Sequence, residues 1–375
     1  MNKQVYENRV EKTSQLMLAE EIDIILLTKP SNMYYLTGDG RLCSYAMING
    51  DGQVALGVPQ TDEDDVRKHA HFDHLATFED EIGMIHSIAD FFKQFGISKG
   101  VVGLEYTFLT QAMMSMVTHP HAKPDDVTVK NCTDIMSKMR IIKEPHEIEL
   151  MREAANVADA GMEAVMASLK AGMTESQLAG EGEYAMRQAG AEGFWRSYVS
   201  SGVRTGIAHG TPTNRKIQDG DIVMIDLHPI VNNYSSDICR MACVGKPSAD
   251  QTRAFDVYQE ALQSTTAKAI AGVGMVELED TLHGVIRDAG YGDNIFGPTI
   301  HGIGINFEEA PLPPGHAFFH GEKAPLPLVE NIPIAIGNCG IYKEEWGVRI
   351  EDTVVVGKDR SMVLTSYPIS FERET

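Results

Sequence analysis

The sequence contains no long apolar run and no C-x-x-C pair. Its apolar stretches, such as 222–225 and 332–336, are far shorter than the roughly 18 residues that a membrane-spanning helix needs. The N-terminal residues lack the apolar core of a signal peptide. The five cysteines are an odd number without zinc-type or redox-type spacing, which favours reduced thiols in the core. We therefore expect a soluble, cytoplasmic protein.

Positive charge is also scarce. The chain has 32 Lys and Arg against 53 Asp and Glu, so its formal net charge is −21. A polyanion would be repelled on average, which argues against nucleic acid and against an acidic membrane surface as partners. With 375 residues, of which 43% are hydrophobic, the chain exceeds one ordinary domain. Two domains are the expectation.

The first part of the chain has the pattern of an α/β module. Apolar runs at 22–27, 53–58 and 101–104 predict strands, and Lys-Pro-Ser-Asn at 29–32 predicts a turn after the first strand. We place this module at residues 1–135. It contains no catalytic motif that we recognise.

A linker at 136–146 is expected to lead into a second domain at 147–375. Apolar residues at helical spacing from Ile148 to Leu169 predict a long helix there. Pro145 suits its first turn, and Gly172 suits its C-terminal cap.

A faint internal repeat runs through this second domain. Residues 172–175, which open a second helix ending near Gly190, recur as 274–277, and residues 187–190 recur as 287–290. Each copy lies at one end of the second helix of a pair, and strand-like segments follow each pair. The repeat predicts a duplicated α-α-β-β unit, although copies this short also match by chance.

Two aspartates lie on neighbouring predicted strands of the first copy. Residues 220–227 and 234–240 read as strands joined by a turn. If that turn is tight and centred between residues 231 and 232, Asp226 faces Asp237 on the same side of the ribbon with Cβ atoms ~5 Å apart. Two ionised carboxylates this close, among apolar neighbours, require a shared proton or a cation.

A divalent metal is the simplest cation for this pair, and the alternative is a pair that points to solvent or is neutralised by Arg240. The second copy has oxygen-bearing residues in corresponding places, Asn338 and Glu351. Its strands would bring them to the same cluster. Between them, His301 lies in an apolar stretch, where the residues alone fit either a hydrogen-bonded core histidine or a ligand.

These motifs resemble the pita-bread-fold family of Xaa-Pro dipeptidases (prolidases), aminopeptidase P, methionine aminopeptidases and creatinase. Residues 26–38 resemble its creatinase-type N-terminal domain. The most specific similarities lie at 208–212, 220–226, 236–240, 301–304 and 347–352. The resemblance implies an α/β N-terminal creatinase-like domain followed by an α+β pita-bread domain with a pseudo-two-fold duplicated α-α-β-β unit.

The resemblance also implies a metal site. The family's two Asp, one His and one of its two Glu ligands fall on Asp226, Asp237, His301 and Glu351, whereas the other Glu is replaced by Asn338. The site would hold one or two divalent ions, of Mn, Zn, Co or Fe. A neutral amide in place of a carboxylate should weaken at least one metal position.

Other departures concern the surroundings of the metal site. Glu308 stands where the peptidases carry a substrate-contacting histidine, and His228 follows Asp226 where small residues are usual. An unusual stretch adds His316 and His320. We expect these three histidines to be candidates for the substrate pocket, with surface positions as the alternative for the last two.

The implied activity is metal-dependent hydrolysis of peptide or related C–N bonds, similar to an Xaa-Pro dipeptidase. His209 and Glu308 would act as catalytic proton carriers, and Arg240 and Arg349 would orient the carboxylates. One alternative is a metal-independent, creatinase-like hydrolase of a small guanidino or amide compound. Another is a non-catalytic binding homologue. The resemblance further implies a homodimer that acts on a small molecule or short peptide.

Overall fold

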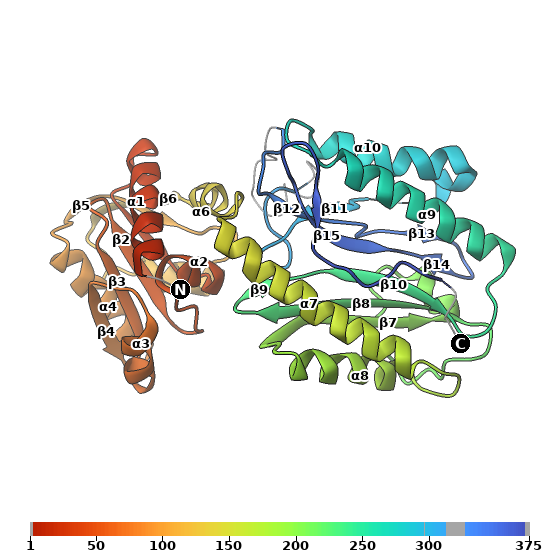
Figure 1. The fold of residues 1–375 in the computed structure, drawn as a ribbon. Coiled ribbons are helices and arrows are strands. Elements are labelled where there is room, and N and C mark those ends of the chain that lie inside the picture. The colour runs from red at the N-terminus through yellow and green to blue at the C-terminus, as the bar shows by residue number, and fades with distance from the viewer. Residues whose placement is uncertain (1–2, 296, 313–326, 372–375) are drawn as a thin grey trace. The chain divides into compact units, whose positions relative to one another are not determined.

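The computed structural model describes residues 3–295, 297–312 and 327–371. The chain folds into two units, one comprising the residues up to Met139 and one beginning at Arg140 (Figure 1). Within the described ranges, no helix is both long and apolar enough to cross a membrane.

The first unit is built on a six-stranded mixed sheet. Its strand order is β4-β3-β2-β1-β5-β6, with β1 parallel to β5 and antiparallel to β2. The three strands expected from the sequence are present as β1, β3 and β5. The strands are β1 Ile24–Leu27, β2 Tyr45–Asn49, β3 Val54–Pro59, β4 His74–Phe78, β5 Lys99–Leu104 and β6 Asp126–Asn131.

Helices accompany this sheet. They are α1 Lys3–Ala19, α2 Pro30–Thr37, α3 Glu63–His69, α4 Glu81–Gln94, α5 Gln111–Val117 and α6 Thr133–Arg140, with a short 3₁₀ turn at Gln60–Asp62. The turn predicted at 29–32 is wrong, because these residues begin α2. Lys29 is the N-cap and Pro30 takes the first helical position, where its fixed φ fits and its missing N–H is not needed.

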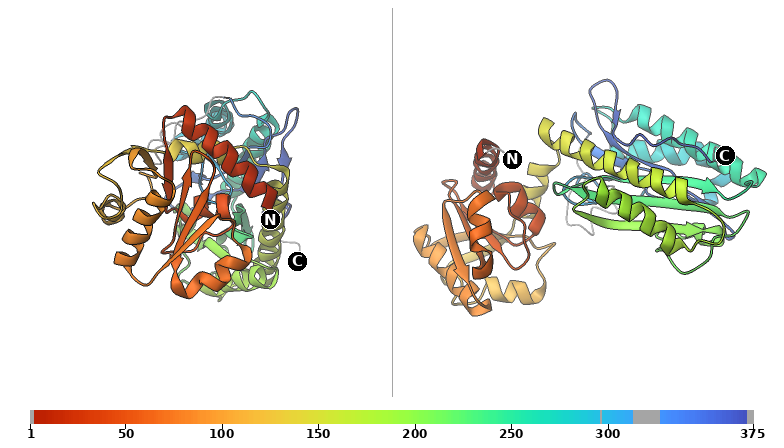
Figure 2. Two further views of the ribbon diagram at one scale, coloured as in Figure 1. Left: turned by 90° about the vertical axis from the view of Figure 1, so that its left-hand side faces the viewer. Right: turned by 60° about the horizontal axis from the view of Figure 1, so that its bottom comes forward.

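The second unit contains two helix pairs and an eight-stranded sheet. The helices are α7 Pro145–Ser168, α8 Glu175–Gln188, α9 Ala249–Lys268 and α10 Met275–Ile286. The α7–α8 pair and the α9–α10 pair flank the strands from two sides (Figures 1 and 2). This is the duplicated arrangement that the repeat predicted. The α7 helix, however, ends at Ser168, so Gly172 is not its cap but lies in the following turn with a φ of 90°.

The main path of this sheet is β11-β12-β15-β10-β8-β7, with β9 paired to β8 and β16 to β15. The hairpin β13–β14 lies apart from it. The strands are β7 Gly193–Ser201, β8 Ile222–Val231, β9 Tyr234–Ser235, β10 Ile238–Cys243, β11 Ile300–Gly302, β12 Pro333–Ile336, β13 Ile341–Tyr342, β14 Gly347–Val348, β15 Glu351–Val355 and β16 Met362–Val363. Shorter helical turns cover Gly202–Gly206, Arg287–Tyr291 and Gly292–Asn294.

Strand β8 is buried on both faces. Ile222 and Met224 belong to a core cluster with residues of α9 and α10. Val223, Ile225 and Leu227 belong to a second cluster with residues of α7 and α8. Because side chains alternate along a strand, Asp226 continues the face of Ile222 and Met224 into the interior.

The hairpin from β8 to β10 differs from the predicted register. Val231 pairs with Tyr234, so the turn is centred between Asn232 and Asn233, which have φ values of 48° and 65°. A two-residue turn of this kind needs positive φ at both positions, and Asn tolerates it well. Asp226 therefore lies opposite Cys239 rather than opposite Asp237. The shift is two residues, so both aspartates still share one face of the sheet.

Candidate metal centre

The candidate site lies across the middle of the second unit's sheet. Tyr198 on β7 pairs with Asp226 on β8, Asp226 pairs with Cys239 on β10, and Cys239 pairs with Glu351 on β15. Directly paired residues project to the same side of a sheet. One row of four strands therefore brings Asp226 and Glu351 to the same face.

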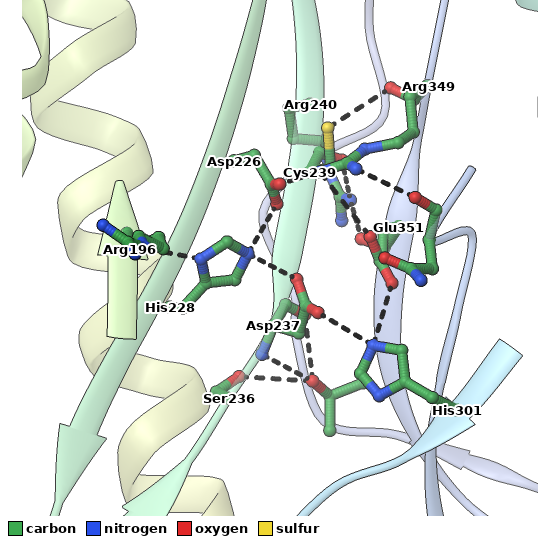
Figure 3. Close-up of polar contacts among 12 residues, drawn as sticks. Arg196, Asp226, His228, Ser236, Asp237, Cys239, Arg240, His301, Arg349 and Glu351 are labelled. Atoms are coloured by element: carbon green, nitrogen blue, oxygen red, sulfur yellow. Dashed lines mark hydrogen bonds and ion pairs between the residues drawn. The ribbon is translucent and has the colours of Figure 1, made fainter. Parts of the chain in front are cut away.

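The remaining residues of the cluster lie beside this row. Asp237 immediately precedes β10, two residues from Cys239, and His301 lies on β11. The hydroxyl of Thr353 accepts a hydrogen bond from the backbone N–H of Asp237 and donates one to its carbonyl, each at 2.9 Å. This clamp fixes the aspartate where β9 and β10 are separated. Figure 3 shows the side chains of these residues directed toward one another.

The geometry groups the side chains into two sets of potential ligands that share Asp237. Asp237, His301 and Glu351 offer ligand atoms that lie within 4.8 Å of one another, and so do Asp226, His228 and Asp237. His301 Nε2 is 3.5 Å from Asp237 Oδ2 and 3.9 Å from Glu351 Oε1. All five residues are at most 1% exposed. Residues 226, 237, 301 and 351, which the sequence suggested, are thus brought together.

The chemistry of this cluster fits a divalent cation. Both carboxylate oxygens of Asp226, Asp237 and Glu351, together with His301 Nε2, are buried and have no hydrogen-bond partner. Buried polar atoms are normally hydrogen-bonded, and buried charges are normally paired or bound to a metal. A set of oxygens and an imidazole nitrogen, all aimed inward, matches the ligands of Mn, Zn, Co or Fe.

The pKa values of these residues also indicate that the cluster favours bound positive charge. Burial and then the charge of Asp237 raise the pKa of Glu351 to about 8. Burial also opposes ionisation of Asp237, but the facing His228 and His301 more than offset it and lower the pKa of Asp237 to about 2. Burial disfavours a charged His301, yet Asp237 and other carboxylates raise its pKa to about 9. Without a metal, the cluster holds protons instead.

The two arginines named from the sequence occupy different positions. Arg349 places Nη2 directly against Asp226 Oδ2, and its Nη1 donates to the carbonyl of Asn338 at 2.9 Å. Arg240 binds the Asp352 carboxylate at 2.7 Å and the backbone carbonyl of Glu351 at 2.8 Å. Arg349 therefore contacts a cluster carboxylate, whereas Arg240 holds the backbone that carries Glu351.

Asn338 follows β12 and is 8% exposed. Its backbone N–H donates to the carbonyl of Thr299 at 3.0 Å. Its backbone is thereby fixed on two sides, through Thr299 and through Arg349.

His209 and Glu308 lie at the edge of the cluster. The ring of His209 is exposed and lies 5.6 Å from the ring of Tyr198, centroid to centroid. Local desolvation and then the charge of Arg349 lower the pKa of His209, and the charge of Glu308 opposes this. The charge of Glu308 also raises the pKa of His301. The neutral form of His209 is thus favoured near pH 7, and it can accept a proton.

Aromatic side chains that the sequence did not single out line the approach. Phe307 packs its ring 4.5 Å from His228, 5.3 Å from His301 and 5.9 Å from Trp195. Trp195 is 57% exposed. A cavity of about 460 Å³ between α8 and β7 is lined in part by Trp195 and Tyr198. Tyr198 is detectable only once β7 is paired with β8, and Phe307 only by its position six residues after His301.

The other sequence expectations have mixed outcomes. His228 is not in an open pocket but inside the cluster of potential metal ligands, with 1% exposure. His316 and His320 lie outside the described residues. All five cysteines are free, as expected, and four are buried, but Cys43 is exposed and so is not a core thiol.

Comparisons with known proteins cover both units of the chain. A model of metallopeptidase family M24 matches residues 149–358, and a model of the creatinase/prolidase N-terminal domain matches residues 9–142. An Xaa-Pro dipeptidase of Pyrococcus furiosus is 30% identical over 364 residues, which cover 96% of this chain and 98% of the relative.

Solved structures give the same result. The prolidase from Pyrococcus furiosus superposes with a TM-score of 0.82 at 28% identity, covering 94% of this chain and 99% of its own. An Xaa-Pro dipeptidase from Bacillus anthracis superposes with a TM-score of 0.88 at 26% identity, covering 98% of this chain and 99% of its own. The similarity therefore extends over both units.

Proposed function

Because the chain belongs to metallopeptidase family M24, we propose that it is a metal-dependent dipeptidase that cleaves the bond between a residue and a C-terminal proline. The family, the fold class and the hydrolase class expected from the sequence are confirmed by the family matches and the solved relatives. The observation that carries the proposed activity is the buried cluster of carboxylates in the matched domain, whose oxygens have no hydrogen-bond partner.

In this proposal, Asp226, Asp237, His301 and Glu351 hold one or two divalent ions of Mn, Zn, Co or Fe. When bound, such an ion polarises the scissile carbonyl and lowers the pKa of a coordinated water. Asn338 supplies at most a neutral carbonyl oxygen, so we expect weaker retention of one metal position. Arg349 fixes the orientation of Asp226, and Arg240 positions Glu351 through its backbone.

Proton transfer is assigned to His209 and Glu308. The lowered pKa of His209 leaves its imidazole neutral near pH 7, as a proton acceptor must be. Its partly solvent-facing ring also allows the proton to leave to water. Glu308 is the acidic residue closest in sequence to the His301 motif. Its negative charge raises the pKa of His301 and so favours the protonated imidazole.

The aromatic residues support a substrate with an apolar ring. Phe307 and Trp195 stack with an interplanar angle of 10° and a centroid distance of 5.9 Å, next to the cluster. A proline side chain has no charge to solvate and packs well against aromatic faces.

A substrate comparison tests this function. Metal-reconstituted protein is assayed on Met-Pro and Leu-Pro, with Met-Ala as the control that lacks the ring, and on creatine and an ectoine-like cyclic amidine. We expect hydrolysis of the proline dipeptides that a chelator abolishes. Hydrolysis of creatine or the amidine by chelator-treated protein would instead establish the metal-independent alternative. A protein that binds one of these compounds but hydrolyses none of them would be a binding homologue.

We also propose that the protein is a cytoplasmic homodimer, as its resemblance to the family suggests. Light scattering of the purified chain should give about twice the monomer mass of 41.2 kDa. A monomer mass across a range of protein concentrations would contradict this.

A further inference from the structure

His228 stands between the two aspartates that begin the metal cluster. Its Nε2 is 3.0 Å from Asp226 Oδ1 and 3.2 Å from Asp237 Oδ1. The ring is held by packing, with Phe307 at 4.5 Å and Tyr198 at 5.7 Å between centroids. The imidazole therefore directs Nε2 at both carboxylates and packs between two aromatic rings.

The hydrogen bond of Nδ1 determines the tautomer of His228 and therefore whether Nε2 presents a lone pair. His228 Nδ1 lies 2.9 Å from the backbone carbonyl of Arg196, and a carbonyl can only accept. Nδ1 therefore carries the hydrogen, and in the neutral ring Nε2 presents a lone pair. A lone pair that faces two carboxylate oxygens is stable only if a proton or a metal ion lies between them. Metal-binding histidines commonly show this arrangement, with one nitrogen on the metal and the other on a carbonyl.

His301 repeats the arrangement on the opposite side of Asp237. Its Nδ1 lies 3.0 Å from the carbonyl of Gly302, and its Nε2 faces Asp237 Oδ2 at 3.5 Å. The two oxygens of Asp237 are thus divided between two imidazoles, Oδ1 toward His228 and Oδ2 toward His301 (Figure 3). A carboxylate between two such nitrogens is placed to bridge two ions.

We propose that His228 is itself a metal ligand and that, with Asp226 and Asp237, it forms a second metal position beside Asp237, His301 and Glu351. This inference rests on the proposed metal-dependent function. The additional imidazole supplies one further ligand atom, although not the negative charge of the carboxylate missing at residue 338. Nitrogen ligation at this position also shifts preference toward metals that bind imidazole well, such as Zn and Co, over purely oxygen-seeking ions.

The competing arrangement is a protonated His228 that takes the place of one ion. The two arrangements predict opposite effects of removing the ring. If His228 binds an ion, its loss removes a metal position; if it substitutes for an ion, its loss creates one.

Metal content and affinity of the full chain separate the two arrangements without any activity assay. Wild type, His228→Ala, His228→Gln and His209→Ala are stripped with chelator, reloaded with Co²⁺ and freed of excess metal. Bound cobalt is measured by elemental analysis, and its affinity by titration calorimetry. Circular dichroism and thermal melts of the stripped proteins check folding, and His228→Gln supplies a polar side chain should the Ala variant be unstable.

We expect wild type and His209→Ala to retain about two equivalents, and the His228 variants to retain about one, with affinity at the lost position reduced at least about 100-fold. Two equivalents with unchanged affinity in folded His228 variants would overturn the inference and leave the proposed function intact. One equivalent in wild type that rises to two in the variants would overturn it in favour of the protonated ring. No cobalt in wild type would overturn both the inference and the proposed metal dependence.

Discussion

Buried carboxylates in the two units differ in their hydrogen bonding. In the first unit, Glu105 is 2% exposed and accepts hydrogen bonds from the backbone N–H groups of Thr28 and Lys29, at 2.8 and 2.9 Å, and from the Asn32 amide. In the second unit, Asp237 and Glu351 are equally buried, but no oxygen of their side chains has a hydrogen-bond partner. A satisfied carboxylate stabilises its fold, whereas an unsatisfied group of them marks a binding site.

The second unit also contains satisfied carboxylates, which makes the contrast a property of the site rather than of the unit. Glu309 is paired with Arg140 and lies 2.7 Å from Lys143 Nζ. Glu175 is fully buried and accepts from Ser201 and Thr213. Isosteric amide substitutions at these positions can test the contrast.

The largest loss of stability is expected from Glu309→Gln. The change removes the negative charge that the buried Arg140 and Lys143 face, and breaking a buried ion pair in this way typically costs about 3–5 kcal/mol. Urea unfolding of the second unit measures it. Burial opposes ionisation of Glu309, but Arg140 and Lys143 lower its pKa from 4.5 to about 2. Its stabilising contribution is therefore complete above pH 4.5 and is lost as the pH falls toward 2.

The control for this prediction is the pH dependence of the unfolding free energy of wild type and of Glu309→Gln. Wild type should lose stability between pH 4.5 and 2 more steeply than Glu309→Gln. Parallel curves for the two proteins would show that the ion pair does not contribute.

Asp237→Asn should act mainly on metal binding. We expect metal affinity and turnover to fall at least about 100-fold, equivalent to about 2.7 kcal/mol, because a direct ligand should matter no less than the groups that orient it. The melting temperature of the stripped protein at pH 7 should also fall, because His228 and His301 lower the pKa of Asp237 to about 2 and its negative charge therefore stabilises the folded chain. Elemental analysis and thermal melts measure the two effects.

Glu175→Gln is the matched control in the same unit. It should lower stability and leave metal content unchanged, because its partners are all hydrogen-bond donors outside the cluster. Full metal retention by Asp237→Asn would refute the role of the cluster.

Glu105→Gln makes the same chemical change in the first unit. The new amide NH₂ would face N–H donors that the carboxylate now satisfies, which costs about 1–3 kcal/mol. Chemical unfolding should show this loss, while cobalt stoichiometry stays at the wild-type value. A variant as stable as wild type would mean that the satisfied carboxylate does not hold the first unit together.

The smallest effect is expected from Asn338→Glu. A restored carboxylate should strengthen metal binding by about tenfold, since it adds one negative charge near the ions. Calorimetric titration with Co²⁺ measures the change, with Asn338→Gln as the control that adds length but no charge. Equal affinities in both variants would show that the neutral residue does not weaken the site.

Most residues of the candidate site could be predicted from short sequence motifs. Asp226, Asp237, His301 and Glu351 stand in short segments whose residue types are distinctive without any knowledge of pairing. The position of His228 between the two aspartates could not be predicted from a motif. It depends on the β8–β10 register, which the turn at residues 232–233 sets. Two adjacent asparagines are a signal for positive φ, and they could have placed the turn one residue further along the chain.

The fold was predictable to a similar extent. The helix pairs follow from apolar spacing and from capping residues such as Thr174, whose capping box is present at the start of α8. The start of α2 was missed because Lys-Pro-Ser-Asn favours both a turn and a helix N-terminus. Local preferences of this kind are resolved by the contacts that the segment makes in the fold.

The sequence by itself determined the family, the two-part chain and the four residues most suited to a metal, because each is encoded in a short stretch of chain. Only the tertiary structure decided that Asp226, Cys239 and Glu351 form one row, and that an imidazole lies between two aspartates. The physical reason is that strand pairing joins residues more than one hundred positions apart, and a shift of two residues changes which side chains meet while leaving the local pattern the same.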